Sequence, residues 1–317
     1  MQQIKLGNSD NHTGDVAVSR GGGFALASTS NGIWKVRLTG KAKPLGVNRV
    51  AAGTPVIHPN GKFAYALSRF NLYVLNVSGK RPKVVRTMNV IRFAGELGLN
   101  MAIAPGGKAL YVKYLGGIRS LSLRNPRKPK PIGRIKQSLE RNGGMQVAKG
   151  GKRLISVVDY GSRQVIYSYN VAKPKRIRVA RKRNVGFPLN DVVIAPGGAY
   201  AYTAGSSIHA AAHFAKVRAK DLKVMRIRRG GFKTRNVNRE IAIAPNGKRV
   251  YGLQTYSPSE GFLDLFSTAP FKRRGQYMGA RWVNGMAVSH RGSTKGRIYV
   301  VGENANGKRV FMTIRVR

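Results

Sequence analysis

Short stretches of alternating apolar and polar residues recur along the whole chain. They come in pairs around a tight turn, as in IHPNGKFAYA at residues 57–66, where PNGK separates two such stretches. An alternation with a period of two predicts β-strands, and Gly supplies the positive φ that such turns require. Segments with a helical period are nearly absent. The pattern therefore predicts an all-β chain built of hairpins.

This hairpin phrase is repeated seven times. Equivalent positions, from Arg20 in the first copy to His290 in the last, lie 39 to 49 residues apart, a spacing typical of propeller blades. Each copy is followed by a third alternating stretch and a weaker fourth one, such as GIRSLSLR and KPIGRI. We therefore expect a single domain, residues 1–317, folded as a seven-bladed β-propeller with four antiparallel strands per blade. The phrases occupy residues 18–27, 57–66, 103–112, 147–156, 194–203, 243–252 and 287–300.

The two ends of the chain indicate how the ring closes. The sequence stops after the third strand of the seventh repeat, and QQIKLG near the N-terminus is a strand that belongs to no repeat. Pairing this strand with the last three completes the seventh blade and removes two open edges. An open solenoid, the alternative, leaves the N-terminal strand unexplained.

The repeats resemble two known types. IAPNGKRVYG and its copies are similar to the YVTN-type propeller repeat, and ALYVKYLGGIRSLSLRNPRKPKPIG resembles the bacterial LVIVD-type repeat. The chain departs from the second pattern at Ser122 and Arg124, where acidic residues are usual. The resemblance implies a propeller of prokaryotic type, often secreted or attached to the cell surface. It implies no single activity, because propellers include both enzymes and passive binding proteins.

The charge of the chain is exceptional. Lys and Arg number 58 and Asp and Glu 11, which leaves a net charge of +47. The cations are spread through the repeats instead of forming a tail, so they belong to the folded body. Such an excess favours acidic partners, and we expect a polyanion, either nucleic acid or an acidic polysaccharide. Cysteine is absent, which excludes disulfides and thiolate metal sites.

Propeller geometry divides these charges between two faces. The connections between first and second strands, and between third and fourth strands, lie on one face, and 28 of the 58 cations fall there with a single acid, Asp221. The opposite face takes nine of the eleven carboxylates. We predict polyanion binding by the cations of the first face, with no recognition helix for base readout. The candidate binding residues are Lys80, Arg81, Lys83, Arg127, Lys128, Lys130, Lys173, Lys175, Arg176, Lys272, Arg273 and Arg274.

A second candidate site lies at the mouth of the central channel, where each first strand begins. The strand register places Asp15, Asn100, Asp191 and Glu240 in this ring, together with Thr54, Gly144 and Gly285. Oxygen ligands around one axis suit a hard cation such as Ca²⁺, or a small polar ligand. The alternative is structural, because Asp and Asn often accept hydrogen bonds from free backbone groups at strand starts.

Motifs for other chemistry are weak. His209 and His213 are spaced to share one face, but no third metal ligand is close in sequence, so ordinary loop histidines remain the simpler interpretation. No nucleophile motif or phosphate-binding glycine loop is present. Aromatic residues such as Phe187, near Arg183, can stack on sugars or bases, or simply cover the blade edges.

These observations leave three classes of function open. The first is a non-enzymatic, monomeric polyanion-binding protein without a resident cofactor. The second is a channel-mouth hydrolase or lyase resembling propeller lactonases, and the third is a scaffold for protein partners. We expect no membrane span, and a secreted or cell-surface location, although the first 15 residues carry no apolar signal core.

Overall fold

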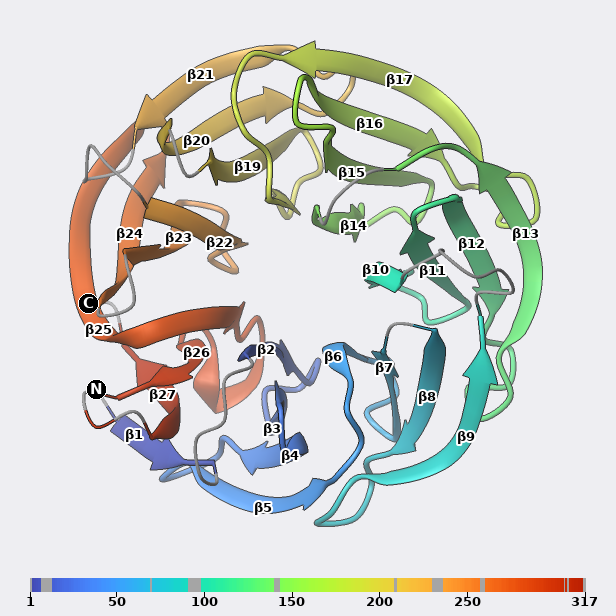
Figure 1. Cartoon of the computed structure of the whole chain (residues 1–317), viewed down its shortest axis with the longest axis vertical. Helices are drawn as coiled ribbons and strands as arrows, with labels where there is room; N and C mark the ends of the chain where they lie inside the picture. Colours follow the sequence, from blue (N-terminus) through green and yellow to red (C-terminus); the bar gives the residue numbers. More distant parts are fainter. Residues whose placement is uncertain are drawn as a thin grey trace.

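The computed structural model is a ring of seven blades around a central channel (Figure 1). It describes residues 2–6, 13–68, 70–90, 98–139, 143–207, 210–229, 236–256, 260–304, 306 and 308–315. Each blade has four antiparallel strands, and the first strand of each lies nearest the channel. The prediction of an all-β, seven-bladed propeller is confirmed.

The first three blades are regular four-stranded sheets. Their boundaries agree with the sequence phrases to within a few residues. Blade 1 holds β2 (Thr13–Val18), β3 (Phe24–Thr29), β4 (Gly32–Arg37) and β5 (Lys43–Asn48); blade 2 holds β6 (Gly53–Ile57), β7 (Phe63–Leu67), β8 (Asn71–Asn76) and β9 (Lys83–Asn89); blade 3 holds β10 (Gly98–Ile103), β11 (Ala109–Tyr114), β12 (Gly117–Ser122) and β13 (Lys130–Lys136).

The next two blades follow the same plan, and the last two share a strand. Blade 4 holds β14 (Met145–Val147), β15 (Arg153–Asp159), β16 (Gln164–Asn170) and β17 (Arg178–Val185); blade 5 holds β18 (Asp191–Ile194), β19 (Tyr200–Ser207), β20 (Ala210–Arg218) and β21 (Val224–Arg229); blade 6 holds β22 (Asn236–Ile243), β23 (Arg249–Tyr256) and β24 (Glu260–Thr268); β25 (Phe271–Val288) continues into blade 7, with β26 (Ile298–Glu303), β27 (Arg309–Ile314) and β1 (Gln2–Lys5).

Strand β25 runs without interruption, whereas the repeat pattern predicts two separate strands here, the fourth of blade 6 and the first of blade 7. Its first part pairs with β24 and its last part with β26, so one extended segment serves as the outermost strand of blade 6 and the innermost strand of blade 7. The short insertion of the seventh repeat forms the 3₁₀ turn η1 (Gly292–Thr294). Within the described residues, no helix is long and apolar enough to cross a membrane.

The ring closes as predicted. Strand β1 pairs antiparallel with β27, from Gln2 opposite Thr313 to Lys5 opposite Val310. A second contact joins blades 1 and 7 at their turns, where the Thr294 hydroxyl donates a hydrogen bond to the Gly22 carbonyl (2.9 Å). The N-terminal strand therefore supplies the outer edge of the seventh blade and covers what is otherwise an open strand edge.

Hydrogen bonds place the two predicted kinds of connection on the same face. The backbone N–H at the start of each third-to-fourth connection donates to a carbonyl of the first-to-second turn, as from Val77 to Lys62 and from Leu123 to Lys108 (both 2.9 Å). The turns themselves use the glycine that the sequence marked, with φ of 69° at Gly61 and 71° at Gly107. We call this side of the disc the basic face.

The hydrophobic core lies between adjacent blades. The recurring Tyr of the second strands is fully buried at Tyr65 and Tyr111. Each of these hydroxyls donates to a carbonyl of the next blade, Tyr65 to Pro126 (2.9 Å) and Tyr111 to Val171 (3.3 Å). The repeated Tyr thus fills the space between sheets and finds a polar partner at its end.

Candidate functional site

A cavity of about 550 Å³ lies where the first strands converge around the channel. Five residues of the predicted ring line it: Asp15, Thr54, Asn100, Asp191 and Glu240. The structure therefore brings together all four candidate channel-mouth residues, although they come from four different blades. The volume of the cavity is in the range of small-molecule sites.

Glycines at the two remaining ring positions make room for the carboxylates. A Cβ atom on Gly144 would lie 1.7 Å from Asp191 Oδ1, and one on Gly285 would lie 2.5 Å from the Asp15 Cα atom. Real Cβ atoms never approach so closely, so a side chain at either position would push the neighbouring strand away.

The carboxylates connect the first strands of neighbouring blades. Asp191 accepts hydrogen bonds from the backbone N–H of Val192 in its own strand (2.7 Å) and from that of Ile241 in the next blade (3.0 Å). Glu240 accepts one from the N–H of Met286, again one blade further on. These bonds satisfy N–H groups that face the gap between blades, where no strand partner is available.

Gln146 makes the same kind of bond, accepting from the N–H of Ile194. A chain of side-chain acceptors thus links the inner strands of blades 4 to 7. The structural alternative that the sequence left open for Asp191 and Glu240 is therefore realised, and it does not exclude ligand binding in the cavity they line.

Burial changes the acidity of the three carboxyl groups. Desolvation raises the pKa of Asp15 to about 6 and that of Asp191 to about 7. Desolvation and the nearby charge of Asp15 raise the pKa of Glu240 well above its usual value. The two carboxyl groups influence one another, and the neighbouring Asp191 charge also contributes to the raised pKa of Glu240.

Lys113 is a member of this cluster that the sequence analysis missed. It comes from the second strand of blade 3 and is fully buried, with its Nζ donating to the carbonyls of Gly143 (3.0 Å) and Val157 (2.8 Å). Burial lowers its pKa to about 7, opposed by the charge of Asp191. The signal was available, since Lys113 is a charged residue within the otherwise apolar strand ALYVKY.

Groups that titrate near pH 7 inside a cavity can act as general acids or bases. The cluster therefore has the proton-transfer capacity that a channel-mouth hydrolase or lyase requires. Its members, however, are engaged with the backbone, and no nucleophile motif accompanies them. The enzymatic alternative stays a prediction.

Calcium binding at the channel also stays a prediction, and the geometry gives no support for a compact ion cage. Within the described residues, no three His, Asp or Glu side chains converge as metal ligands. If Asp15 and Glu240 take up Ca²⁺, the ion competes with protons for these carboxyl groups, because their pKa values are raised. Added Ca²⁺ should then raise the melting temperature more at pH 8 than at pH 6, and Asp15→Asn with Glu240→Gln should abolish that rise. An identical melting temperature with and without Ca²⁺ at both pH values would return these residues to a structural role alone.

The predicted polyanion-binding residues all lie on or beside the basic face. Lys80, Arg81, Lys83, Arg127, Lys128, Lys130, Lys173, Lys175, Arg176, Lys272 and Arg274 are exposed there, in the third-to-fourth connections or the first residues of the fourth strands. Arg273 is the exception. Its guanidinium bonds to the buried Asp264 carboxylate (3.0 Å), so its charge is compensated inside blade 6 and is poorly placed for a ligand.

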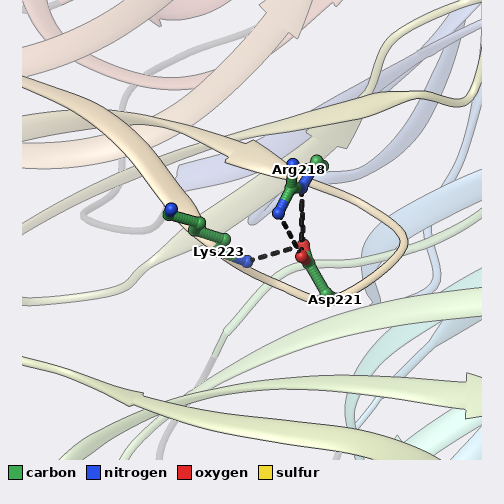
Figure 2. A network of polar contacts seen from close by, with 3 residues as sticks. All are labelled: Arg218, Asp221 and Lys223. Carbon is green, nitrogen blue, oxygen red and sulfur yellow. Dashed lines mark hydrogen bonds and ion pairs between the residues drawn. The ribbon is translucent and has the colours of Figure 1, made fainter.

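The single acid of this face is also compensated. Asp221, in the turn between β20 and β21, accepts from the Arg218 guanidinium (2.5 Å) and from the backbone N–H of Lys223 (3.1 Å), as Figure 2 shows. The Arg218 pair holds the pKa of Asp221 well below its usual range. This carboxylate therefore stabilises the turn. Because it is engaged there, it does not neutralise the other cations around it.

The histidine pair is only partly described. His209 lies outside the described residues, while His213 stacks on Phe187 with ring centroids 6.2 Å apart. Phe187 is buried, as expected if it covers a blade edge. The structure therefore adds nothing to the weak metal motif, and it places His213 in an aromatic contact between blades 4 and 5.

Comparison with models of protein families gave no match, and neither did comparison with curated proteins.

Proposed function

We propose that this protein is a non-enzymatic binding protein that engages polyanions through its basic face. The observation that carries the proposal is the uncompensated charge of that face. With 58 cations and 11 carboxylates in the chain, at least 47 cations have no carboxylate of their own. Most of those in the third-to-fourth connections are exposed at one side of the disc, with Arg218 and Arg273 paired to Asp221 and Asp264.

This arrangement suits recognition of charge density. Lys and Arg side chains release counterions from a polyanion when they neutralise it, which drives binding without reading sequence. Base readout in a duplex usually needs a helix or a β-ribbon inserted into a groove, and the connections of this face are short turns. The likeness to YVTN and LVIVD repeats agrees with a secreted or cell-surface role, which forms part of the proposal.

The salt dependence of binding tests this function. Affinity for heparin and for random-sequence duplex DNA should fall linearly on a log–log plot against salt, with a slope of about −0.9 per neutralised phosphate on the duplex. Changing Arg127, Lys128 and Lys130 to Glu should weaken binding by about tenfold or more at moderate salt and make the slope shallower.

Three exposed cations away from this face provide the matched control. Arg49, Arg163 and Lys308 lie in connections of the opposite face, so their reversal to Glu changes the net charge by the same amount. It should have a much smaller effect. Equal losses from the two triple variants would contradict binding by the basic face, and salt-independent binding would contradict polyanion recognition altogether.

A further inference from the structure

Blades 3 and 4 each carry a dense run of exposed cations. Every Lys and Arg in residues 124–136 and 173–183 is exposed, six in the first segment and seven in the second. Neither segment contains an acidic or an aromatic residue. Each begins on the basic face and continues along the outermost strand, β13 in blade 3 and β17 in blade 4. We call these two segments the basic belt.

The two halves of the belt are joined. The Ser120 hydroxyl of blade 3 donates to the Pro174 carbonyl of blade 4 (2.6 Å), and a Cβ atom on Gly133 would lie 2.7 Å from the Pro174 and Lys175 oxygens. Strands β13 and β17 follow one another around the outer edge of the disc (Figure 1). The belt is thus a continuous cationic path on a convex surface.

A convex path favours a flexible ligand. A folded chain of this length has a radius of gyration of about 20 Å, whereas duplex DNA stays straight over about 50 nm. A duplex therefore touches the edge only along a short tangent. A single strand can bend around the edge and place successive phosphates on both halves of the belt.

The belt ends at a pocket. A cavity of about 540 Å³ lies between blades 4 and 5, where β17 reaches the face opposite the basic face. Arg183, the last cation of the belt, forms part of its wall, and the stacked His213 and Phe187 rings form another part. Val224 and Ile227 of β21 complete it, and Ile227 is 41% exposed.

We infer that the basic belt and this pocket together bind single-stranded nucleic acid, with phosphates along β17 and one base in the pocket. The inference rests on the proposed function and deepens it by naming the polyanion.

The chemistry of the pocket selects this ligand among polyanions. Its wall is half apolar and partly aromatic, which suits the flat face of a base attached to a charged backbone. Arg183 and Asn184, also in the wall, can hydrogen-bond to the polar edge of the base. A duplex keeps its bases stacked inside and offers nothing for the pocket to take. Base identity is read weakly, because every base has a π-face.

Two probes with equal charge isolate the role of the base. Binding of the whole chain is measured by fluorescence anisotropy with an oligothymidylate, and with an abasic oligodeoxyribose phosphate of the same length. We expect the oligothymidylate to bind about tenfold more tightly, in line with the contribution of a stacked base. Arg181→Glu should weaken both probes equally, because it removes only charge.

Gly186→Leu adds a bulky apolar side chain at the wall of the pocket. Gly186 belongs to its wall, and a Cβ atom there meets no heavy atom within 4 Å. This variant should remove the preference for the oligothymidylate and leave heparin binding unchanged. Gly275→Leu, at another open glycine in β25, is the control and should retain the preference. Melting curves of both variants check that the fold is intact.

The outcomes separate the two proposals. Equal binding of the two probes by the wild-type chain, with a steep salt dependence for both, overturns the single-strand inference and leaves polyanion binding standing. A preference that persists in Gly186→Leu overturns the assignment to this pocket. Salt-independent or absent binding of all probes, heparin included, overturns both proposals.

Discussion

A chain that lacks residues 2–6 should lose much of its resistance to unfolding and should aggregate. These residues include β1, whose four residue pairs with β27 complete blade 7, and Leu6 directly after it. Leu6 is fully buried in the core between blades 1 and 7, and Ile4 packs against the same cluster. The deletion removes this apolar contact and exposes the backbone edge of β27, which can then pair with another molecule.

The point variant Leu6→Ala separates packing from edge exposure. Truncation of a buried Leu costs about 2–5 kcal/mol, because a cavity remains where the side chain was. Lys5→Ala, at an exposed position of the same strand, should change stability little. Urea unfolding followed by tryptophan fluorescence measures all three proteins, and light scattering detects association. Closure by β1 is contradicted if the shortened chain unfolds at the same urea concentration as the full chain.

Stability should pass through a minimum near pH 7 because of the channel cluster. The folded-state pKa values of Asp15 and Asp191 are raised from 3.8 to about 6 and about 7, and that of Glu240 is also raised. Between about pH 4 and 7 the folded state therefore binds more protons than the unfolded state, and the free energy of unfolding falls as pH rises. A pKa shift as large as that of Asp15 corresponds to about 3 kcal/mol in the free energy of unfolding.

Lys113 affects the stability of the protein above this pH range. Its pKa is lowered from 10.5 to about 7 in the folded state, so the unfolded state binds more protons between about pH 7 and 10. Stability should therefore recover as pH rises through that window. Most proteins lose stability on mild acidification, whereas this one should be more stable at pH 5 than at pH 7. The exposed Asp221 pair opposes this trend only weakly, because solvent screens it.

Variants of the cluster check the assignment. Asp191→Asn should make the decline between pH 4 and 7 shallower by up to about 1.4 kcal/mol per pH unit, the contribution of one proton. Lys113→Met should remove the recovery above pH 7. Asp159→Asn, which removes a carboxylate outside the channel wall, should leave the profile unchanged. Unfolding free energies from urea titrations across pH 4–10 provide the measurement, and a wild-type profile without a minimum would show that the cluster does not titrate as described.

The sequence by itself determined the number of blades, the strand order and the closure of the ring. Each of these depends on local features: an alternation of period two, a glycine turn such as that at Gly61, and a repeat spacing near that of a blade. Because the register follows from the turns, the sequence also placed Asp15, Asn100, Asp191 and Glu240 around one channel. In the same way it placed the third-to-fourth cations on one face.

Only the tertiary structure decided what those side chains touch. Asp191 and Glu240 accept hydrogen bonds from the backbone N–H groups of neighbouring blades, contacts between segments that no local pattern relates. The structure also decided that Arg273 pairs with Asp264 on the adjacent strand of blade 6. The burial of Lys113 beside Gly143 depends on how two sheets pack, which fixes both its desolvation and its pKa. The pocket at the end of β17 likewise exists only because β20 and β21 of the next blade stand against it. Side-chain partners depend on distances between blades, and these are set by packing over the whole ring, whereas the blades themselves are specified one repeat at a time.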